Sequence, residues 1–417
     1  MKHTNKTIVF FTDFYHPSVE GVTASVDLFA KALRKQGHRV YIVAPAHTKP
    51  LTTDHPDVIR LPSVPSVFYR GLRDGILTPK YGELIRSLKA DIYHGHTNMI
   101  VGLGGMRLSV DHNVPSVATY HTDQEQYSKV YRGVWAGILI GSIMGPFVSN
   151  KPDTFPKMMS GLKPRKSLDA WNTQMIQNLL KVCFDQYDHV IVPSKKILTI
   201  LKNYHVSRPI SIVPTGLELD DFATVEKPAR KKTDKFQLLY VGRLAEEKNI
   251  ALIIDMMYEL QHKKPDQFEC TMVGPSLHMD IYRQHAKRLG VDNIITFTGA
   301  KSRSEALQSY YSADAFIFPS VTDTQAIVLN EAAYSKLPLL FSDPEISRVA
   351  INNKTGLLLK PTPKAYAQAV IKLNQDPGLA HALGQAAHHE ALKFTMDRQA
   401  TLLDRIYDKV IYNHAKK

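Results

Sequence analysis

Short apolar runs of strand length alternate along this chain with segments whose apolar positions recur at helical spacing. Residues 7–11, 22–36 and 39–44 follow one another as strand, helix and strand. Residues 236–241 and 250–262 begin the same order again in the second half. A strand, a crossover helix and a second strand form the βαβ unit of dinucleotide-binding folds, in which the strands are parallel. The pattern therefore predicts an α/β protein with a parallel sheet in each half.

The length of the chain favours two domains. A chain of 417 residues is long for one hydrophobic core, so two domains of about 200 residues each are expected. We place the first over residues 1–205 and the second over residues 206–395, followed by a helical segment over residues 396–417. Residues 227–235 are rich in Lys and Arg, which is typical of a solvated linker, and they are the expected hinge.

The net charge of +13 is concentrated in the first half. Residues 1–205 contain 25 Lys and Arg against 15 Asp and Glu, and residues 206–417 contain the remaining 27 against 24. A basic surface can attract nucleic acid or the anionic inner leaflet of a membrane. Because the chain has no zinc-finger spacing and no aromatic ribonucleoprotein motif, the charge favours a membrane over nucleic acid.

Two further features bear on the compartment. The N-terminus runs into the first strand without the apolar segment and cleavage site of a signal peptide, so a cytoplasmic protein is expected. Cys183 and Cys270 are far apart in the sequence, and we interpret them as buried small hydrophobic residues rather than as a disulfide or a metal site.

One segment of the first half departs from the sheet pattern. Residues 133–150 contain no charged side chain, have glycine at every fourth position from Gly133 to Gly145, and are flanked by Lys and Arg. The apolar part is too short to span a bilayer. It is either an interfacial segment held by its flanking cations or a buried helix whose glycine face lets a neighbour approach.

The clearest chemical pattern lies in the second half, where a strand passes through a polar loop into a helix. Residues 315–318 are apolar, Pro319 ends the run, and apolar positions at helical spacing begin at Ile327. Asp323 in the loop and Glu331 in the helix bracket this junction. A helix that starts above a parallel sheet directs backbone N–H groups at its ligand, so the junction suits a diphosphate. An ordinary strand-loop-helix unit is the alternative.

A second junction carries two cations. Gly242, Arg243 and Leu244 follow the strand 236–241, and Lys248 lies just before the next helix. A guanidinium and an ammonium group near a helix start would stabilise a departing diphosphate. The alternative is an ion pair at the helix start with Glu246 or Glu247.

Three histidines of the first half stand where predicted strands end, and one glycine stands where the first loop ends. His94, His96 and His121 end two predicted strands, and ligands of open parallel sheets gather at such ends. We interpret His94 and His96 as residues that line this cleft, because two histidines without a third partner do not form a metal site. Gly21 ends the first loop and either lets the backbone approach a ligand or opens the helix.

An acidic residue followed by seven residues and then Glu resembles the motif of the retaining family-4 glycosyltransferases. The resemblance covers almost the whole chain and includes Gly242, Arg243 and Lys248. It implies the GT-B fold, in which two Rossmann-like domains face each other across a cleft that holds the active site, and in which the last helix packs back on the first domain. Thr324 and Gln325 look most like the members that glycosylate membrane lipids.

The resemblance also implies roles for individual residues. Asp323 and His121 would contact the donor sugar, Glu331 the ribose, and Arg243 and Lys248 the phosphates. The implied catalytic residues are Asp323, His121, Arg243 and Lys248. The implied nucleotide-sugar site consists of Gly21, Gly242, Arg243, Lys248, Thr324, Gln325, Ala326, Ile327 and Glu331.

The expected activity is transfer of a hexose, with glucose favoured, from a nucleotide sugar, with UDP-glucose favoured, to a membrane lipid such as diacylglycerol. Configuration would be retained, with no cofactor and no metal, by a cytoplasmic protein bound peripherally to the inner face of the membrane. The same chemistry on a polysaccharide, teichoic acid or protein acceptor is one alternative. A catalytically silent binding protein is another, because Asp323, Ala326 and Lys336 stand where the family usually has Glu, Gly and Gly.

Overall fold

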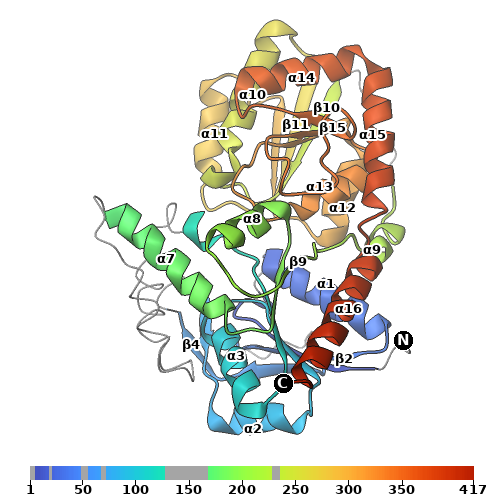
Figure 1. Ribbon diagram of the computed structural model, residues 1–417. Helices are drawn as coiled ribbons and strands as arrows, with labels where there is room; N and C mark the ends of the chain where they lie inside the picture. The colour runs from blue at the N-terminus through green and yellow to red at the C-terminus, as the bar shows by residue number, and fades with distance from the viewer. Residues whose placement is uncertain (1–4, 18–20, 48–54, 67–71, 127–167, 228–234) are drawn as a thin grey trace. The chain divides into compact units, whose positions relative to one another are not determined.

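The computed structural model describes residues 5–17, 21–47, 55–66, 72–126, 168–227 and 235–417 (Figure 1). Contacts divide the chain into two compact units: the first joins Met1–Thr215 to Gln399–Lys417, and the second is Gly216–Arg398. Each unit contains one parallel sheet with flanking helices, so the predicted α/β class is confirmed.

The first unit is built on a seven-stranded sheet. Its strands are β1 (Thr7–Phe11), β2 (Arg39–Pro45), β3 (Val58–Leu61), β6 (Ile92–Gly95), β7 (Ser116–Thr119), β8 (His189–Val192) and β9 (Ile210–Ile212). They stand in the order β3, β2, β1, β6, β7, β8, β9, and every neighbouring pair is parallel. The order reverses between β1 and β6, which is where ligands gather on sheets of this kind. A separate antiparallel pair joins β4 (Ser63–Pro65) to β5 (Arg73–Gly75).

Helices of the first unit cover this sheet. They are α1 (Gly21–Lys35), α2 (Pro79–Ser87), α3 (Ile100–His112), α7 (Leu168–Phe184), α8 (Lys195–Asn203) and most of α16 (Met396–His414). Strand β1 lies deep in the core, since the side chains from Ile8 to Phe11 are fully buried. Cys183 is a buried free thiol in α7, and burial raises its pKa to about 12.

Helix α16 is fixed to the first unit by buried polar contacts. Lys6 Nζ lies 2.7 Å from a carboxylate oxygen of Asp404 and 2.7 Å from one of Asp408. Lys6 and Asp404 are both buried, so each would be a costly isolated charge without the other. Lys6 and His38 favour the ionised form of Asp404 and, against the effect of burial, hold its pKa at about 2. The hydroxyl of Tyr407 is 2.6 Å from Nδ1 of His94 on β6.

The second unit is built on a six-stranded parallel sheet. Its strands are β10 (Phe236–Val241), β11 (Phe268–Val273), β12 (Ile295–Gly299), β13 (Ala315–Phe318), β14 (Leu339–Phe341) and β15 (Gly356–Leu358). The order is β12, β11, β10, β13, β14, β15, so this sheet reverses between β10 and β13. All four side chains of β13 are buried, which explains why its sequence is apolar throughout.

The helices of the second unit mostly alternate with its strands along the chain. They are α9 (Leu219–Ala223), the 3₁₀ helix η1 (Glu246–Lys248), α10 (Ile250–Lys263), α11 (Met279–Arg288), α12 (Arg303–Tyr311), α13 (Ile327–Tyr334), α14 (Pro363–Gln375) and α15 (Pro377–Ala391). The helices α10 and α13 are the first α-helices after β10 and β13. The loops before them therefore meet at the reversal point of the sheet.

The division between the units differs from the one expected. The sequence placed it after residue 205, whereas contacts place it after Thr215, because β9 still pairs with β8 in the first sheet. Phe222 and Val225 already pack in the core of the second unit, so the division also precedes the basic piece 227–235. The uncharged segment 133–150 lies outside the described residues.

Candidate active site

Two loops of the second unit are fastened together at the carboxyl ends of β10 and β13. Asn249 donates from Nδ2 to the carbonyl oxygen of Pro319 at 2.9 Å, and Thr322 donates from Oγ1 to the carbonyl oxygen of Glu247 at 2.9 Å. Lys248 forms an ion pair with Asp323. These contacts bring together the two sequence motifs, which are 75 residues apart in the chain.

The turn that carries Arg243 depends on two glycines. Gly242 and Gly274 have φ angles of +150° and +149°, which L side chains rarely adopt. A Cβ on Gly274 would lie 1.9 Å from the carbonyl oxygen of Gly242, so the two chain segments touch there. The buried Tyr240 hydroxyl donates to the carbonyl oxygen of Arg243 at 3.0 Å. The backbone of Arg243 is thus fixed while its side chain stays accessible, with 41% of its surface exposed.

Both cations of the motif have acidic partners in the structure. Arg243 donates from Nη2 to Oε1 of Glu247 at 2.7 Å, which is one of the two partners that the sequence suggested. Lys248 and Asp323 are about equally shielded from solvent, at 16% and 15% exposure. Asp323 Oδ2 is buried without a hydrogen-bond partner among the described residues. An incoming anion could therefore replace a carboxylate at either cation, and Asp323 keeps acceptor capacity for a hydroxyl group.

Glu331 of α13 is almost fully buried and is held from both sides. Its Oε2 accepts from the Tyr310 hydroxyl at 2.7 Å, and its Oε1 pairs with Arg303. Arg303 also donates from Nε to Asp221 at 3.2 Å. Burial disfavours the charged guanidinium, but the two carboxylates outweigh it and raise the pKa of Arg303 above its ordinary value. The carboxylate of Glu331 is thereby fixed in one orientation, with lone pairs left for a ligand.

Sequence reasoning missed Arg303 and Tyr310. The Ser-x-x-Glu pattern at the start of α12 is visible in the sequence, and Ser302 and Glu305 form a capping box there. That pattern gives no information on which side chains of α12 would reach α13. Only the presence of basic and aromatic residues in α12 could have suggested partners for a buried acid.

The residues between Asp323 and α13 show why alanine is tolerated at position 326. Thr324 and Gln325 are half-buried, Ala326 is buried, and α13 begins at Ile327. Ala326 has a φ of −106° and a ψ of 90°, which any residue adopts. Alanine at position 326 therefore does not strain the backbone of this loop.

In the first unit, His121 follows β7 and lies beside His96, which follows β6. Nδ1 of His96 is 3.1 Å from Nε2 of His121. Burial lowers the pKa of His121 to about 4, so the ring is uncharged at neutral pH. His94 and His96 are only 1% exposed, so they are core residues rather than the cleft residues expected. No group of three or more His, Cys, Asp or Glu among the described residues is arranged to hold a metal ion.

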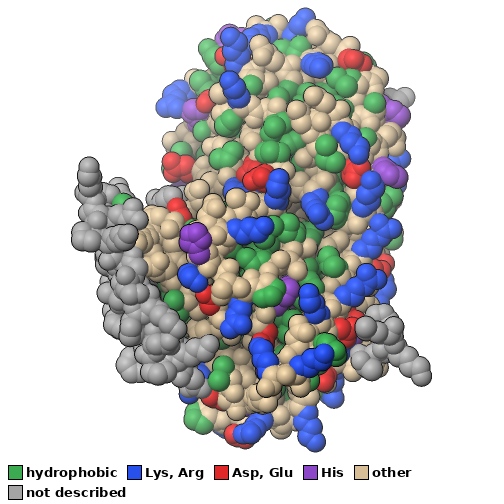
Figure 2. Space-filling view, viewed as in Figure 1, with side chains coloured by type: hydrophobic (Ala, Val, Ile, Leu, Met, Phe, Trp, Pro, Cys, Tyr) green, Lys and Arg blue, Asp and Glu red, His purple; other side chains and the backbone are tan. Residues whose placement is uncertain are grey.

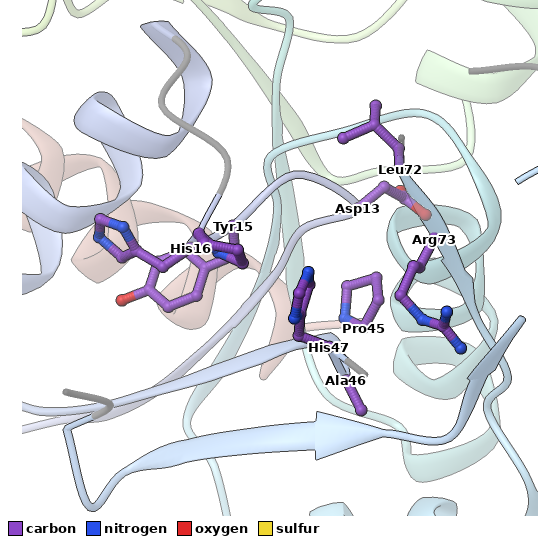
Figure 3. Close-up of a pocket in the computed structure, with 9 residues that line it drawn as sticks. Asp13, Tyr15, His16, Pro45, Ala46, His47, Leu72 and Arg73 are labelled. Carbon is purple, nitrogen blue, oxygen red and sulfur yellow. The ribbon is translucent and has the colours of Figure 1, made fainter. Parts of the chain in front are cut away.

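A pocket of about 220 Å³ lies beside the loop that follows β1 (Figure 3). Tyr15 and His16 lie on one side of it, and Leu72 and Arg73 lie on the other.

Gly21 starts α1 with an ordinary backbone, and a Cβ there would have no atom within 4 Å. The fold of the described residues thus does not require glycine at position 21.

Two family descriptions match the chain in succession. "Glycosyltransferase Family 4" matches residues 19–221, and "Glycosyl transferases group 1" matches residues 221–390. Together the matches extend from residue 19 to residue 390. The chain belongs to the glycosyltransferases.

Curated relatives of this glycosyltransferase include enzymes of lipid glycosylation. An alpha-monoglucosyldiacylglycerol synthase of Streptococcus pneumoniae is 26% identical over 363 residues, which cover 84% of this chain and 74% of that protein. An enzyme of the same name from Acholeplasma laidlawii is 23% identical and covers 98% of both chains.

Solved structures show that the glycosyltransferase has the GT-B fold. A sucrose-phosphate synthase from Thermosynechococcus elongatus has a TM-score of 0.71 at 18% identity, with 98% of this chain and 100% of that chain covered. HepE of Anabaena, solved in complex with UDP, has a TM-score of 0.70 at 15% identity, with 97% and 100% covered. The predicted fold and the predicted enzyme class are both confirmed.

Lys336 of the glycosyltransferase, where the family usually has glycine, ends α13 in a left-handed conformation. Its φ is +64°, its N–H donates to the carbonyl of Ala333 at 3.0 Å, and the N–H of Leu337 donates to the carbonyl of Ala332 at 3.1 Å. This is a Schellman motif, whose left-handed position favours glycine. Lys336 therefore marks a helix end rather than a lost catalytic feature.

The Lys336→Gly variant is expected to be more stable than the wild type by about 1 kcal/mol, because glycine adopts the left-handed conformation without strain. Urea unfolding measures the difference. The Lys336→Ala variant is the control, since alanine keeps the strain and should bring no such gain. A Lys336→Gly protein less stable than the wild type would contradict this account.

Proposed function

We propose that the chain transfers glucose from UDP-glucose to a membrane lipid such as diacylglycerol, with retention of the anomeric configuration. The observation that supports the donor class is the set of charged groups at the reversal point of the second sheet. Arg243 and Lys248 supply two positive charges there, and Asp323 supplies a hydrogen-bond acceptor beside them. The names of the two relatives described above support glucose and a diacylglycerol lipid.

Each side chain receives one role in this proposal. Arg243 and Lys248 bind the diphosphate, exchanging Glu247 and Asp323 for phosphate oxygens. Asp323, released from Lys248, accepts hydrogen bonds from hydroxyl groups of the sugar. Glu331, fixed by Arg303 and Tyr310, accepts the ribose hydroxyls. The N–H groups at the start of α13 face the phosphates.

Retention follows if attack and departure occur on the same face of the sugar. The bond between the anomeric carbon and the phosphate oxygen breaks while the acceptor oxygen bonds to that carbon. The proton of the acceptor hydroxyl passes to the departing phosphate oxygen, so no protein nucleophile is required. Positive side chains at the diphosphate stabilise the charge that develops there. We propose that they do so without a divalent cation or another cofactor.

The proposed place of action is the inner face of the cell membrane, with the protein bound peripherally from the cytoplasm. The excess of ten positive charges in the first half supports attraction to anionic lipid. Figure 2 shows Lys and Arg side chains spread over the viewed face. Among the residues that the structure describes, no helix is long and apolar enough to cross a bilayer.

Transfer from labelled UDP-glucose to vesicles that contain diacylglycerol tests the proposal. We expect an α-linked glucosyl lipid, formed faster on anionic vesicles at low salt and still formed in the presence of EDTA. The anomeric proton coupling in the NMR spectrum of the product identifies the linkage. A β-linked product contradicts retention, and label found on a polysaccharide, teichoic acid or protein instead of lipid contradicts the acceptor. If the protein turns over none of the sugar nucleotides tested, a binding protein without catalytic activity is indicated.

A further inference from the structure

Three histidine rings lie in a row at the carboxyl ends of β6 and β7. The rings of His94 and His96 stack with centroids 4.1 Å apart, and His96 lies nearly parallel to His121 with centroids 5.4 Å apart. Phe10 of β1 packs against His96 with centroids 4.4 Å apart. The middle ring of the row is therefore enclosed by fixed aromatic neighbours.

Hydrogen bonds fix the inner end of the row. The hydroxyl groups of Tyr407 and Thr119 lie 2.6 Å from Nδ1 and from Nε2 of His94, so both nitrogens of that ring are engaged. His96 contacts His121 through Nδ1 at 3.1 Å. Nε2 of His96 is buried and has no hydrogen-bond partner among the described residues. Within the described part of the chain, the ring of His96 thus has one polar contact, and that contact is to the predicted catalytic histidine.

The direction of this hydrogen bond follows from the unpartnered nitrogen. Burial lowers the pKa of His96 and of His121, so both rings are neutral and each carries one proton. If His121 donated, the proton of His96 would be on Nε2, as a buried N–H group without an acceptor. If His96 donates from Nδ1, only a lone pair is left unsatisfied. Buried donors without an acceptor are rarer in proteins than buried acceptors without a donor, so the second arrangement is favoured.

We infer that His96 is a positioning residue that donates from Nδ1 to Nε2 of His121 and so places the single proton of His121 on its own Nδ1. An isolated neutral imidazole carries its proton mainly on Nε2, so His96 holds His121 in the less common tautomer. The inference rests on the proposed sugar transfer and on the contact of His121 with the donor sugar that the family resemblance implies, and it specifies that contact. His121 donates a hydrogen bond from Nδ1 to a sugar oxygen, and it is not the group that accepts the proton of the acceptor hydroxyl.

Two substitutions of His96, by side chains of nearly equal shape, test whether His96 acts through its hydrogen bond or only through packing. The amide nitrogen of asparagine reaches the place of Nδ1, so the His96→Asn protein can still donate to His121. Leucine has a similar shape but forms no hydrogen bond. We expect the His96→Leu protein to lose about tenfold in kcat for sugar transfer, the value of one hydrogen bond, and the His96→Asn protein to keep most of it. Equal losses in both variants would overturn the positioning role.

The tautomer itself is measured without any substrate. In protein labelled with ¹⁵N-histidine, long-range proton-nitrogen spectra distinguish the two tautomers, and a His121→Gln protein identifies the signals. The wild type is expected to show His121 protonated on Nδ1, and the His96→Leu protein a shift towards protonation on Nε2. A wild-type His121 protonated on Nε2 would overturn the inference. Because this result does not depend on turnover, it stands apart from failure of the proposed function.

The Thr119→Val variant is the control that shows whether loosening the core is enough to shift the tautomer of His121. Valine matches the shape of threonine but removes a buried hydrogen bond from His94, two rings away from His121. Thermal unfolding should show a loss of stability in this variant, with the tautomer of His121 unchanged. A tautomer shift in the Thr119→Val protein equal to that in His96→Leu would show that loosening the core is sufficient, and the inference would fail.

Discussion

Replacing Lys248 by alanine is expected to lower sugar transfer by about 10²-fold or more. Lys248 would stabilise the diphosphate as it departs, and removal of one preorganised electrostatic contact typically has an effect of that size. Arg243→Ala should have a similar effect, because its guanidinium would bind the same group. Initial rates with saturating acceptor measure both losses.

The loss should not arise from unfolding. Lys248 stands at the end of η1 and its ammonium group pairs with Asp323, whose side chain is 15% exposed, so circular dichroism of the variant should match that of the wild type and thermal unfolding should show only a small loss of stability. Lys263→Ala is the matched control. Lys263 pairs with Glu259 on the exposed side of α10, and such surface pairs contribute little. Near-normal turnover of the Lys248→Ala protein would contradict the assignment of the diphosphate site.

The second large effect concerns Asp323. We expect Asp323→Ala to abolish transfer, because the variant lacks the acceptor for the sugar hydroxyls. Asp323→Glu should keep or raise the activity, because it restores the longer side chain usual in the family. Rates of sugar transfer by the two variants measure both effects. Equal rates in the Asp323→Ala protein and the wild type would contradict the role of this carboxylate. If neither the wild type nor the Asp323→Glu protein transferred sugar, the result would favour a binding protein.

Binding of UDP separates the two roles of Asp323. The nucleotide without its sugar needs Lys248 but not the sugar-binding carboxylate. Since Asp323 is also the ion-pair partner of Lys248, its removal should leave the affinity for UDP unchanged or higher. Calorimetric titration measures this affinity. Weaker binding of UDP to the Asp323→Ala protein would show that the carboxylate organises the diphosphate site rather than binding the sugar.

The sequence was sufficient for the regular parts of the fold. Runs such as residues 238–241 are buried on both faces of a parallel sheet, so they are apolar throughout and easily recognised. Gly242 was recognised from its motif, and the structure adds the positive φ and the contact with Gly274. Local pattern thus predicted the strands, the helices after them and the loops where the charged residues lie.

What the sequence could not predict depends on side-chain directions and long-range contacts. The partner of Glu331 is 28 residues away on another helix, and no period in the sequence relates Arg303 to it. Lys336 and Ala326 differ from the usual residues of the family, but only the backbone angles show that one caps a helix and the other is unstrained. The burial of His94 likewise depends on Tyr407, which is 313 residues away.

The contribution of α16 to the first unit has a consequence for biosynthesis. The ribosome makes this unit in two parts, with all of Gly216–Arg398 synthesised between them. Lys6 is made before the second unit, while Asp404 and Asp408, which pair with its ammonium group, are made after it. Until translation reaches them, the first sheet would have to bury an ammonium group without a counter-charge. The second unit, whose residues are contiguous, can complete its core first, so the first unit is begun before the second and completed after it.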